Sequence, residues 1–255
     1  MTFGLALLHG FTGSPTSFDE VRSRLGQGFT VVAPKLVGHG DPADALVRDF
    51  AGEVDRIAAL LQEGGPSWYV LGYSLGGRIA LGLLARHPTL FAGATLIGAQ
   101  PGLESDEARA SRRADDERLA TLLETDGIDA FIAQWEALPL FATQASLDPA
   151  VLERQRAERR AHDPRGLARS LRATGLGVMP SYWNSLGAIT TPVRLAAGTL
   201  DPKFATIARE MARGMPRATV ELVEGVGHNV VLERPAAVVE MLKRGVADAG
   251  AGTRS

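Results

Sequence analysis

Residues 68–86, with the sequence WYVLGYSLGGRIALGLLAR, decide the fold. The first four are apolar and rich in aromatic and branched side chains, which is typical of a buried strand. Leu75–Arg86 repeats apolar residues at helical spacing. Between these two segments, residues 72–76 (GYSLG) match the G-x-S-x-G pattern, in which a tight turn from strand to helix exposes a serine hydroxyl. The stretch therefore predicts a strand, a sharp turn with a candidate nucleophile at Ser74, and a helix.

The same alternation of strand and helix continues on both sides of this stretch. Short apolar runs that end near Gly or Pro predict buried strands at Leu5–Leu8, Phe29–Ala33, Ala94–Ile97, Val193–Ala197 and Thr219–Val223. Amphipathic patterns predict further helices at Ser17–Leu25, Ala43–Gln62, Ala205–Arg213 and Pro235–Val246. Because parallel strands need helical crossovers, this order predicts an α/β fold with a mostly parallel sheet and helices on both faces.

One long segment interrupts the alternation. Residues 101–185 contain no strand-like run, and helical patterns cover Glu104–Glu124, Ile128–Ala137, Pro149–Ala161 and Gly166–Ala173. A helical insertion of this size in an α/β alternation is typical of a lid over an active site. We therefore expect a core formed by residues 1–100 and 186–248, a lid at 101–185, and a small, polar, disordered tail at 249–255.

Composition excludes several classes of protein. The chain has 255 residues, 45% of them hydrophobic and 22% charged, and a formal net charge of −2. No overall basic field is available for nucleic acid, and the absence of Cys excludes disulfides and thiolate metal sites. The apolar run near the N-terminus is too short for a membrane span, and no metal or cofactor motif occurs. We expect a cytoplasmic monomer or weak homo-oligomer that binds neither nucleic acid nor membranes and uses no metal and no cofactor.

Two partners for Ser74 follow predicted strands. His228 lies in the loop after the last strand, and Asp201 follows the strand at 193–197, so both belong at the carboxyl edge of the sheet. A serine needs an imidazole to activate it, and that imidazole needs a carboxylate to fix its tautomer. The sequence therefore predicts a Ser74–His228–Asp201 triad, with Asp201 also a candidate helix cap. The other histidines are expected in structural roles, as solvated or capping residues: His9, His39, His87 and His162.

Backbone amides near Ser74 can stabilise a developing negative charge. The amide of Leu75 follows the nucleophile at the start of its helix, where the helix dipole favours anions. The loop His9–Gly13 (HGFTG) follows the first strand, and its glycines allow the Phe11 amide to turn inward. The sequence therefore predicts an oxyanion hole formed by the Phe11 and Leu75 amides.

These motifs resemble the α/β-hydrolase superfamily over nearly the whole chain. Segments of the lid and core are more specifically similar to the 2-succinyl-6-hydroxy-2,4-cyclohexadiene-1-carboxylate synthases of menaquinone biosynthesis. The segments that carry this resemblance are GYSLGGR at 72–78, PGL at 101–103, R-x-x-R-x-x-x-D at 109–116, W-x-x-LPLFA at 135–142, Arg159, GLA-x-SLR at 166–172, Met179-Pro180 and D-x-KF at 201–204.

The resemblance implies a carbon–oxygen lyase that needs no cofactor. It implies that Ser74 acts as a base on a C–H bond beside a succinyl ketone and that pyruvate is eliminated from 2-succinyl-5-enolpyruvyl-6-hydroxy-3-cyclohexene-1-carboxylate. The substrate carries three carboxylates, and a guanidinium can bind each of them through two N–H donors. The carboxylate-binding positions of the family fall on Arg78, Arg112 and Arg159, and its aromatic pocket positions on Tyr73 and Trp135.

Two alternatives remain open at this point. A carboxylesterase or C–C bond hydrolase would use the same triad, since only the lid and its arginines favour elimination. A binding protein built on a hydrolase scaffold would keep affinity for its ligand without turnover.

The sequence supports a binding role more strongly for Arg78 than for the lid arginines. Arg78 is one helical turn after Ser74, which places both on the same side of that helix. Arginines on a lid, in contrast, are often surface residues paired with acids.

Overall fold

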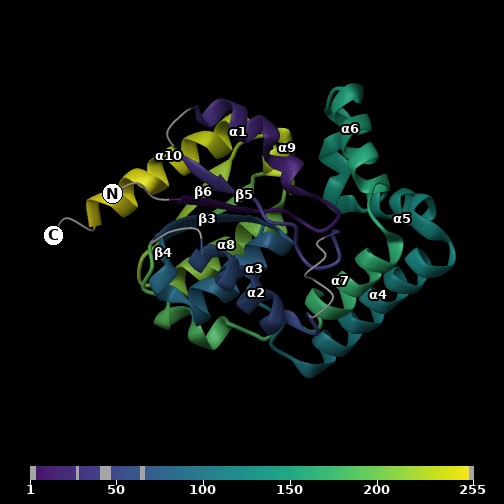
Figure 1. The fold of residues 1–255 in the computed structure, drawn as a ribbon, viewed down its shortest axis with the longest axis horizontal. Coiled ribbons are helices and arrows are strands. Elements are labelled where there is room, and N and C mark those ends of the chain that lie inside the picture. The colour runs from purple at the N-terminus through teal and green to yellow at the C-terminus, as the bar shows by residue number, and fades with distance from the viewer. Residues whose placement is uncertain (1–3, 27–28, 41–46, 64–66, 253–255) are drawn as a thin grey trace.

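A six-stranded parallel sheet forms the centre of the described part of the chain in the computed structural model (Figure 1). The structure describes residues 4–26, 29–40, 47–63 and 67–252. Every strand pair is parallel, and the strand order is β2-β1-β3-β4-β5-β6. The strands are β1 Gly4–Leu8, β2 Thr30–Val32, β3 Trp68–Tyr73, β4 Phe91–Ile97, β5 Val193–Gly198 and β6 Ala218–Val223. The predicted α/β fold is confirmed.

Alternate side chains of the strands enter two separate hydrophobic layers. In β1, Ala6 and Leu8 belong to one layer, whereas Leu5 and Leu7 belong to the other. This follows from the two-residue period of a strand. Both faces of the sheet are therefore buried, which explains why the strand sequences are almost continuously apolar.

Helices cover both faces of the sheet (Figure 1). On one face lie α2 Phe50–Glu63, α3 Leu75–Arg86 and α8 Pro202–Gly214, and on the other lie α1 Asp19–Leu25 and α10 Pro235–Gly252. Short helical segments η1 Pro15–Phe18, η3 Pro88–Leu90, η5 Trp183–Ala188 and α9 Val230–Glu233 join these elements. Within the described ranges, no helix is long and apolar enough to cross a membrane.

The part of the chain that connects β4 to β5 forms a layer of helices. This layer lies beside the carboxyl ends of the strands, at the right of Figure 1. Its elements are α4 Asp106–Thr125, α5 Gly127–Glu136, η4 Pro139–Ser146, α6 Pro149–Arg160 and α7 Pro164–Thr174. Leu123, Phe131, Leu167 and neighbouring residues form a small hydrophobic core of its own. We refer to residues 101–185 as the lid.

Two predicted boundaries are wrong. The helix expected at Ala43–Gln62 begins only at Phe50, because the Asp49 carboxylate accepts a hydrogen bond from the Gly52 amide (2.8 Å) and residues 47–49 lie outside the helix. Residues 43–46 of that prediction lie outside the described residues. The tail expected from residue 249 is helical to Gly252, since the side chain of Ala249 is buried against the sheet. The last three tail residues are not described.

Candidate active site

Ser74 lies on a strained turn between β3 and α3. Its backbone angles are φ +51° and ψ −107°, a conformation that non-glycine residues rarely adopt. A Cβ atom at Gly72 would lie 2.3 Å from the Gly76 carbonyl oxygen, and one at Gly76 would lie 2.0 Å from that of Leu8. Only glycine fits at these two positions, so the G-x-S-x-G spacing is required by backbone packing. The turn brings the Ser74 hydroxyl to the edge of the sheet.

The structure brings Ser74, His228 and Asp201 into hydrogen-bonding contact. The Ser74 hydroxyl donates to Nε2 of His228 at 3.1 Å, and Nδ1–H of His228 donates to Oδ2 of Asp201 at 2.8 Å. His228 and Asp201 are both buried. A buried carboxylate in this position fixes the imidazole tautomer that accepts the serine proton. The arrangement can therefore convert Ser74 into a base or a nucleophile.

Neighbouring elements hold the two partners of Ser74 in place. Asp201 is the N-cap of α8, because its Oδ1 accepts from the Phe204 amide at 3.2 Å while its Oδ2 binds His228. Next to His228, the Gly227 amide donates to the Glu233 carboxylate at 2.8 Å. The centroid of the Phe204 ring lies 4.4 Å from that of the His228 imidazole. Asp201 thus caps α8 and binds the His228 imidazole at once.

Phe11 and Leu75 both line the same cavity as Ser74. Leu75 is the first residue of α3, where amide groups have no partner within the helix. Phe11 lies in the loop after β1, and a Cβ atom at the adjacent Gly10 would lie 2.7 Å from the Tyr73 ring. This glycine therefore allows the loop to approach the nucleophile. The assignment of the two amides as an oxyanion hole remains a prediction.

A cavity of about 820 Å³ lies between the sheet edge and the lid. Its volume is within the range of small-molecule sites. Tyr73 and Trp135, the two predicted aromatic residues, line it, and burial raises the pKa of the Tyr73 phenol. Five cationic side chains also line it: Arg78, Arg112, Arg154, Arg159 and Lys203. The three predicted arginines are thus brought to one cavity with Ser74.

Arg78 and Arg112 form a partly neutralised pair that lines this cavity. The Arg78 guanidinium donates to the Thr174 carbonyl oxygen at 2.7 Å. Nε of Arg112 donates to Oδ1 of the buried Asp116 at 2.8 Å. Burial, and then the charge of Arg112, lower the pKa of Arg78 to about 10. With one acid for two guanidinium groups, this end of the cavity keeps a positive charge that favours an anionic ligand.

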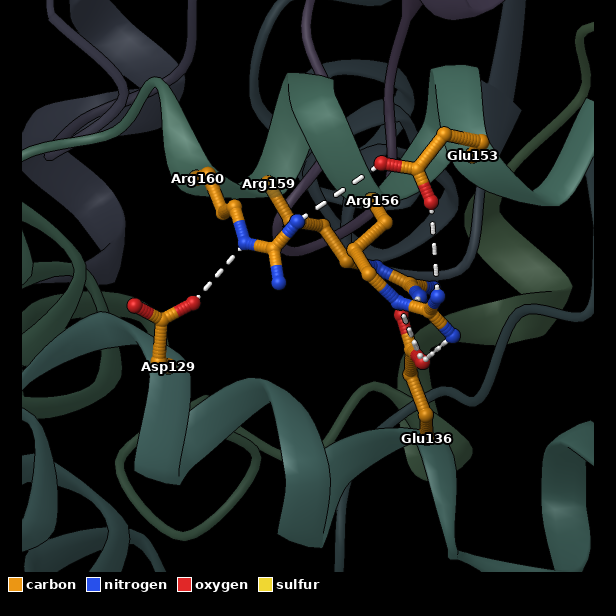
Figure 2. A network of polar contacts seen from close by, with 6 residues as sticks. All are labelled: Asp129, Glu136, Glu153, Arg156, Arg159 and Arg160. Atoms are coloured by element: carbon orange, nitrogen blue, oxygen red, sulfur yellow. Dashed lines mark hydrogen bonds and ion pairs between the residues drawn. The ribbon is translucent and has the colours of Figure 1, made fainter.

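Arg159 is held by an ion-pair network that joins α5 to α6. Figure 2 shows Arg156 and Arg159 both reaching Glu136, with N–O distances of 2.7 Å. Desolvation raises the pKa of Glu136, but hydrogen bonds from the two arginines outweigh it and the net pKa is lowered. Trp135 precedes Glu136, so the same network orients two predicted ligand-binding residues. Arg159 Nε and Trp135 Nε1 are both buried without a hydrogen-bond partner.

Sequence reasoning missed two cavity cations. Lys203 lies two residues after Asp201, and its ammonium is 5.6 Å from the Phe204 ring. Its position close after Asp201 and the end of β5 is the signal that could have identified it. Arg154 is on α6 one turn before Glu158, and nothing in the sequence separates it from the surface arginines of that helix.

His9 and His39 have the structural character expected of them, but they are neither solvated nor capping. Both side chains are buried, and ring centroids of this pair are 4.8 Å apart. Burial lowers the pKa of His9 to about 4 and holds the pKa of His39 well below its usual range. His87 is half-buried and pairs with Asp55 at 2.7 Å. The imidazoles of His9 and His39 are therefore structural and neutral.

Stability should fall as the pH is lowered from 7 to 5. The pKa of His9 is near 6.5 in the unfolded chain and about 4 in the folded protein, so protons bind the unfolded chain preferentially between these values. For His9 alone, the loss in free energy of unfolding is about 2 kcal/mol between pH 7 and 5. Urea unfolding followed by circular dichroism measures it. A His9→Gln variant should show a smaller pH dependence; an unchanged dependence would contradict the assignment.

Comparison with known proteins gives consistent matches over most of the chain. The Alpha/beta hydrolase family matches residues 5–241. The chain is 33% identical over 242 residues to the 2-succinyl-6-hydroxy-2,4-cyclohexadiene-1-carboxylate synthase of Klebsiella pneumoniae subsp. pneumoniae, covering 93% of this chain and 91% of that one. It is 32% identical over 239 residues to the protein of the same name from Citrobacter koseri, with the same two coverages.

Solved structures show the same relationship. The structure of MenH from S. aureus superposes with a TM-score of 0.93 and 27% identity, covering 98% of this chain and 96% of that one. A thermophilic esterase from Thermogutta terrifontis superposes with a TM-score of 0.83 and 24% identity, covering 98% and 91%. The second likeness concerns the fold alone, and it shows that the scaffold is shared with an ester hydrolase.

Proposed function

The chain belongs to the α/β-hydrolase family and, within it, to the group of the 2-succinyl-6-hydroxy-2,4-cyclohexadiene-1-carboxylate synthases, and on this premise we propose that it eliminates pyruvate from 2-succinyl-5-enolpyruvyl-6-hydroxy-3-cyclohexene-1-carboxylate in menaquinone biosynthesis. One observation carries the proposal: Arg78, Arg112 and Arg159 line the same cavity as the Ser74–His228 pair. Three guanidinium groups match the three carboxylates of this substrate in number, and each can bind a carboxylate through two N–H donors.

The proposed reaction begins with proton transfer from carbon. His228 accepts the Ser74 proton, and the Ser74 oxygen takes the proton from the carbon beside the succinyl ketone. The electron pair of that C–H bond moves into the ketone, whose oxygen becomes negative. The Phe11 and Leu75 amides are the proposed donors to this oxygen, and preorganised donors lower the barrier because they need no rearrangement.

Elimination completes the reaction. The dienolate re-forms the ketone, a ring double bond shifts into conjugation, and the C–O bond to the enolpyruvyl group breaks. The pyruvate enolate leaves with that electron pair and takes the proton from the His228 imidazolium onto its CH2 carbon, which restores neutral His228, while Ser74 already carries the proton that it took from the substrate. The charges that line the cavity supply binding and orientation, while the triad and the two amides supply the chemistry.

Pyruvate release tests this proposal directly. The purified protein should release one pyruvate for each substrate molecule consumed, measured by lactate dehydrogenase and loss of NADH absorbance. The conjugated diene of the product provides a second, independent ultraviolet signal. No pyruvate above an enzyme-free control at saturating substrate would contradict the proposal. Rapid turnover of neutral p-nitrophenyl esters instead of pyruvate release would identify an esterase on the same scaffold.

A further inference from the structure

The lid contacts the loop that carries Phe11 at several separate points. We call residues 9–13 the oxyanion loop, because it holds one of the two proposed oxyanion donors. Thr12, next to Phe11, has φ +66°, the left-handed region that a branched residue rarely adopts. Such a conformation persists only where surrounding contacts stabilise it. The contacts that do so come from both the core and the lid.

Two imidazoles bind the backbone of Thr12. The Thr12 amide donates to Nε2 of His39 at 3.2 Å, and the Thr12 carbonyl oxygen accepts from Nε2–H of His162 at 3.2 Å. His39 belongs to the core, whereas His162 belongs to the lid, between α6 and α7. The two rings lie 5.1 Å apart. The Thr12 amide is one peptide unit from the Phe11 amide and the Thr12 carbonyl is two, so the contacts of Thr12 restrict the direction of the Phe11 amide.

The hydrogen bonds determine the tautomers of the core imidazoles. Nδ1–H of His39 donates to the Val37 carbonyl oxygen at 3.0 Å, which leaves Nε2 as the acceptor for Thr12. In the same way, Nδ1–H of His9 donates to the Gly10 carbonyl oxygen at 2.8 Å, and its Nε2 accepts from the Leu36 amide. His9 and His39 thus bind backbone groups on both sides of Phe11.

The Phe11 side chain is part of the aromatic cluster of the lid. Its ring centroid lies 5.3 Å from that of Trp135 and 6.1 Å from that of Phe131, with edge-on geometry at both. Both partners are on α5. Edge-on aromatic contacts add to the stabilisation given by burial. The residue that offers a backbone donor to the site is therefore anchored to the lid by its own side chain.

The carboxylate of Glu158, on α6 and four residues before His162 in the chain, binds the segment that follows the oxyanion loop. Oε1 of Glu158 accepts hydrogen bonds from the hydroxyls of Ser14, Thr16 and Ser17 at 2.5, 3.1 and 2.9 Å. Glu158 on α6 and His162 just after this helix thus bind neighbouring parts of the same segment, and together they form one docking edge. This edge holds residues 12–17 against the lid.

We propose that the lid forms part of the oxyanion hole, with His162 as a positioning residue that directs the Phe11 amide toward the reacting oxygen. This inference rests on the oxyanion hole of the proposed function. Lid docking and assembly of the catalytic donors are then one event. His9 and His39 hold the loop from the core, and the lid contact of His162 completes its alignment, so substrate bound by the lid arginines is activated fully only when the lid is docked.

His162→Met and His162→Gln test this role. Methionine keeps the bulk but loses the N–H donor to Thr12, and kcat for pyruvate release should fall about tenfold with KM within twofold of the wild-type value. Glutamine retains a terminal N–H donor, and its kcat should stay within threefold of wild type. His87→Met is the matched control, because His87 pairs with Asp55 away from the cavity, and its kcat should not change.

A second readout separates this inference from the proposed function. The rate at which a fluorophosphonate ester modifies Ser74, followed by intact-protein mass spectrometry, also depends on the oxyanion hole but not on the natural substrate. It should fall about tenfold in His162→Met and recover in His162→Gln. Equal rates for Met, Gln and wild type, or equal losses for Met and Gln, would overturn the inference. If His162→Met fails to fold, His162→Phe, which keeps the ring, replaces it.

Discussion

Ser74→Ala should lower kcat for pyruvate release by at least about 10³-fold, because it removes both the base and the hydrogen bond between that base and the His228 imidazole. The Ser74 hydroxyl is bonded to Nε2 of His228, and alanine offers neither an oxygen for the proton nor a partner for that imidazole. Cβ is already present at this strained position, so the variant adds no steric conflict to the turn between β3 and α3. Steady-state kinetics with the lactate dehydrogenase assay measures the loss.

Ligand binding distinguishes a chemical defect from a structural one. Because Ser74 is not one of the proposed carboxylate ligands, titration calorimetry of Ser74→Ala with the substrate should give a dissociation constant within about threefold of wild type. A variant that binds the substrate and still releases pyruvate at the wild-type rate would remove Ser74 from the mechanism. A wild-type protein that binds but never turns over would instead identify a binding protein on this scaffold.

The contact between Ser74, His228 and Asp201 could be predicted from the sequence, because local rules set its geometry. Ser74, Asp201 and His228 each follow a predicted strand, and parallel strands end at one edge of the sheet. The glycines at 72 and 76 alone indicate the tight turn, because a side chain at either position would collide with the backbone. The prediction needs only the order of strands along the chain and these local signals. The parallel topology then brings residues that are far apart in the sequence to the same edge of the sheet.

The contacts of the lid could not be predicted in the same way. Whether Arg159 faces the cavity or solvent depends on Glu136 of another helix, and an arginine-rich amphipathic pattern is compatible with both. His9 and His39 look like ordinary loop residues, because their burial is produced by segments distant in sequence. Their roles depend on packing between the lid and the core, for which a single sequence carries no periodic signal.

Arg78→Met should weaken binding of the tricarboxylate substrate by about 1.5–3 kcal/mol, which is roughly a 10- to 150-fold increase in the dissociation constant. The guanidinium of Arg78 lines the cavity and has a lowered pKa because it is desolvated beside Arg112. An anion that replaces this lost hydration gains a strong charge-assisted contact. Methionine preserves most of the side-chain volume, so α3 should still pack. Titration calorimetry with the substrate, and KM for pyruvate release, measure the effect.

Arg112 needs a compensated design, because removing it alone would leave the buried Asp116 without its ion-pair partner. Arg112→Met combined with Asp116→Asn removes both charges, and combined with Arg78→Met it should weaken binding by about 3–6 kcal/mol if the two contacts are independent. A smaller sum would show that both guanidinium groups bind one carboxylate.

Arg86→Met is the matched control for these variants, since Arg86 lies on the same helix and pairs with Asp55 at the surface. It should leave the dissociation constant unchanged. Hydrolysis of a neutral p-nitrophenyl ester, if wild type shows any, should also be unaffected by Arg78→Met, because an uncharged substrate has no carboxylate to bind. Equal losses with the tricarboxylate and the neutral ester would mean that Arg78 supports the fold of the cavity, and the charge argument for a trianionic substrate would then fail.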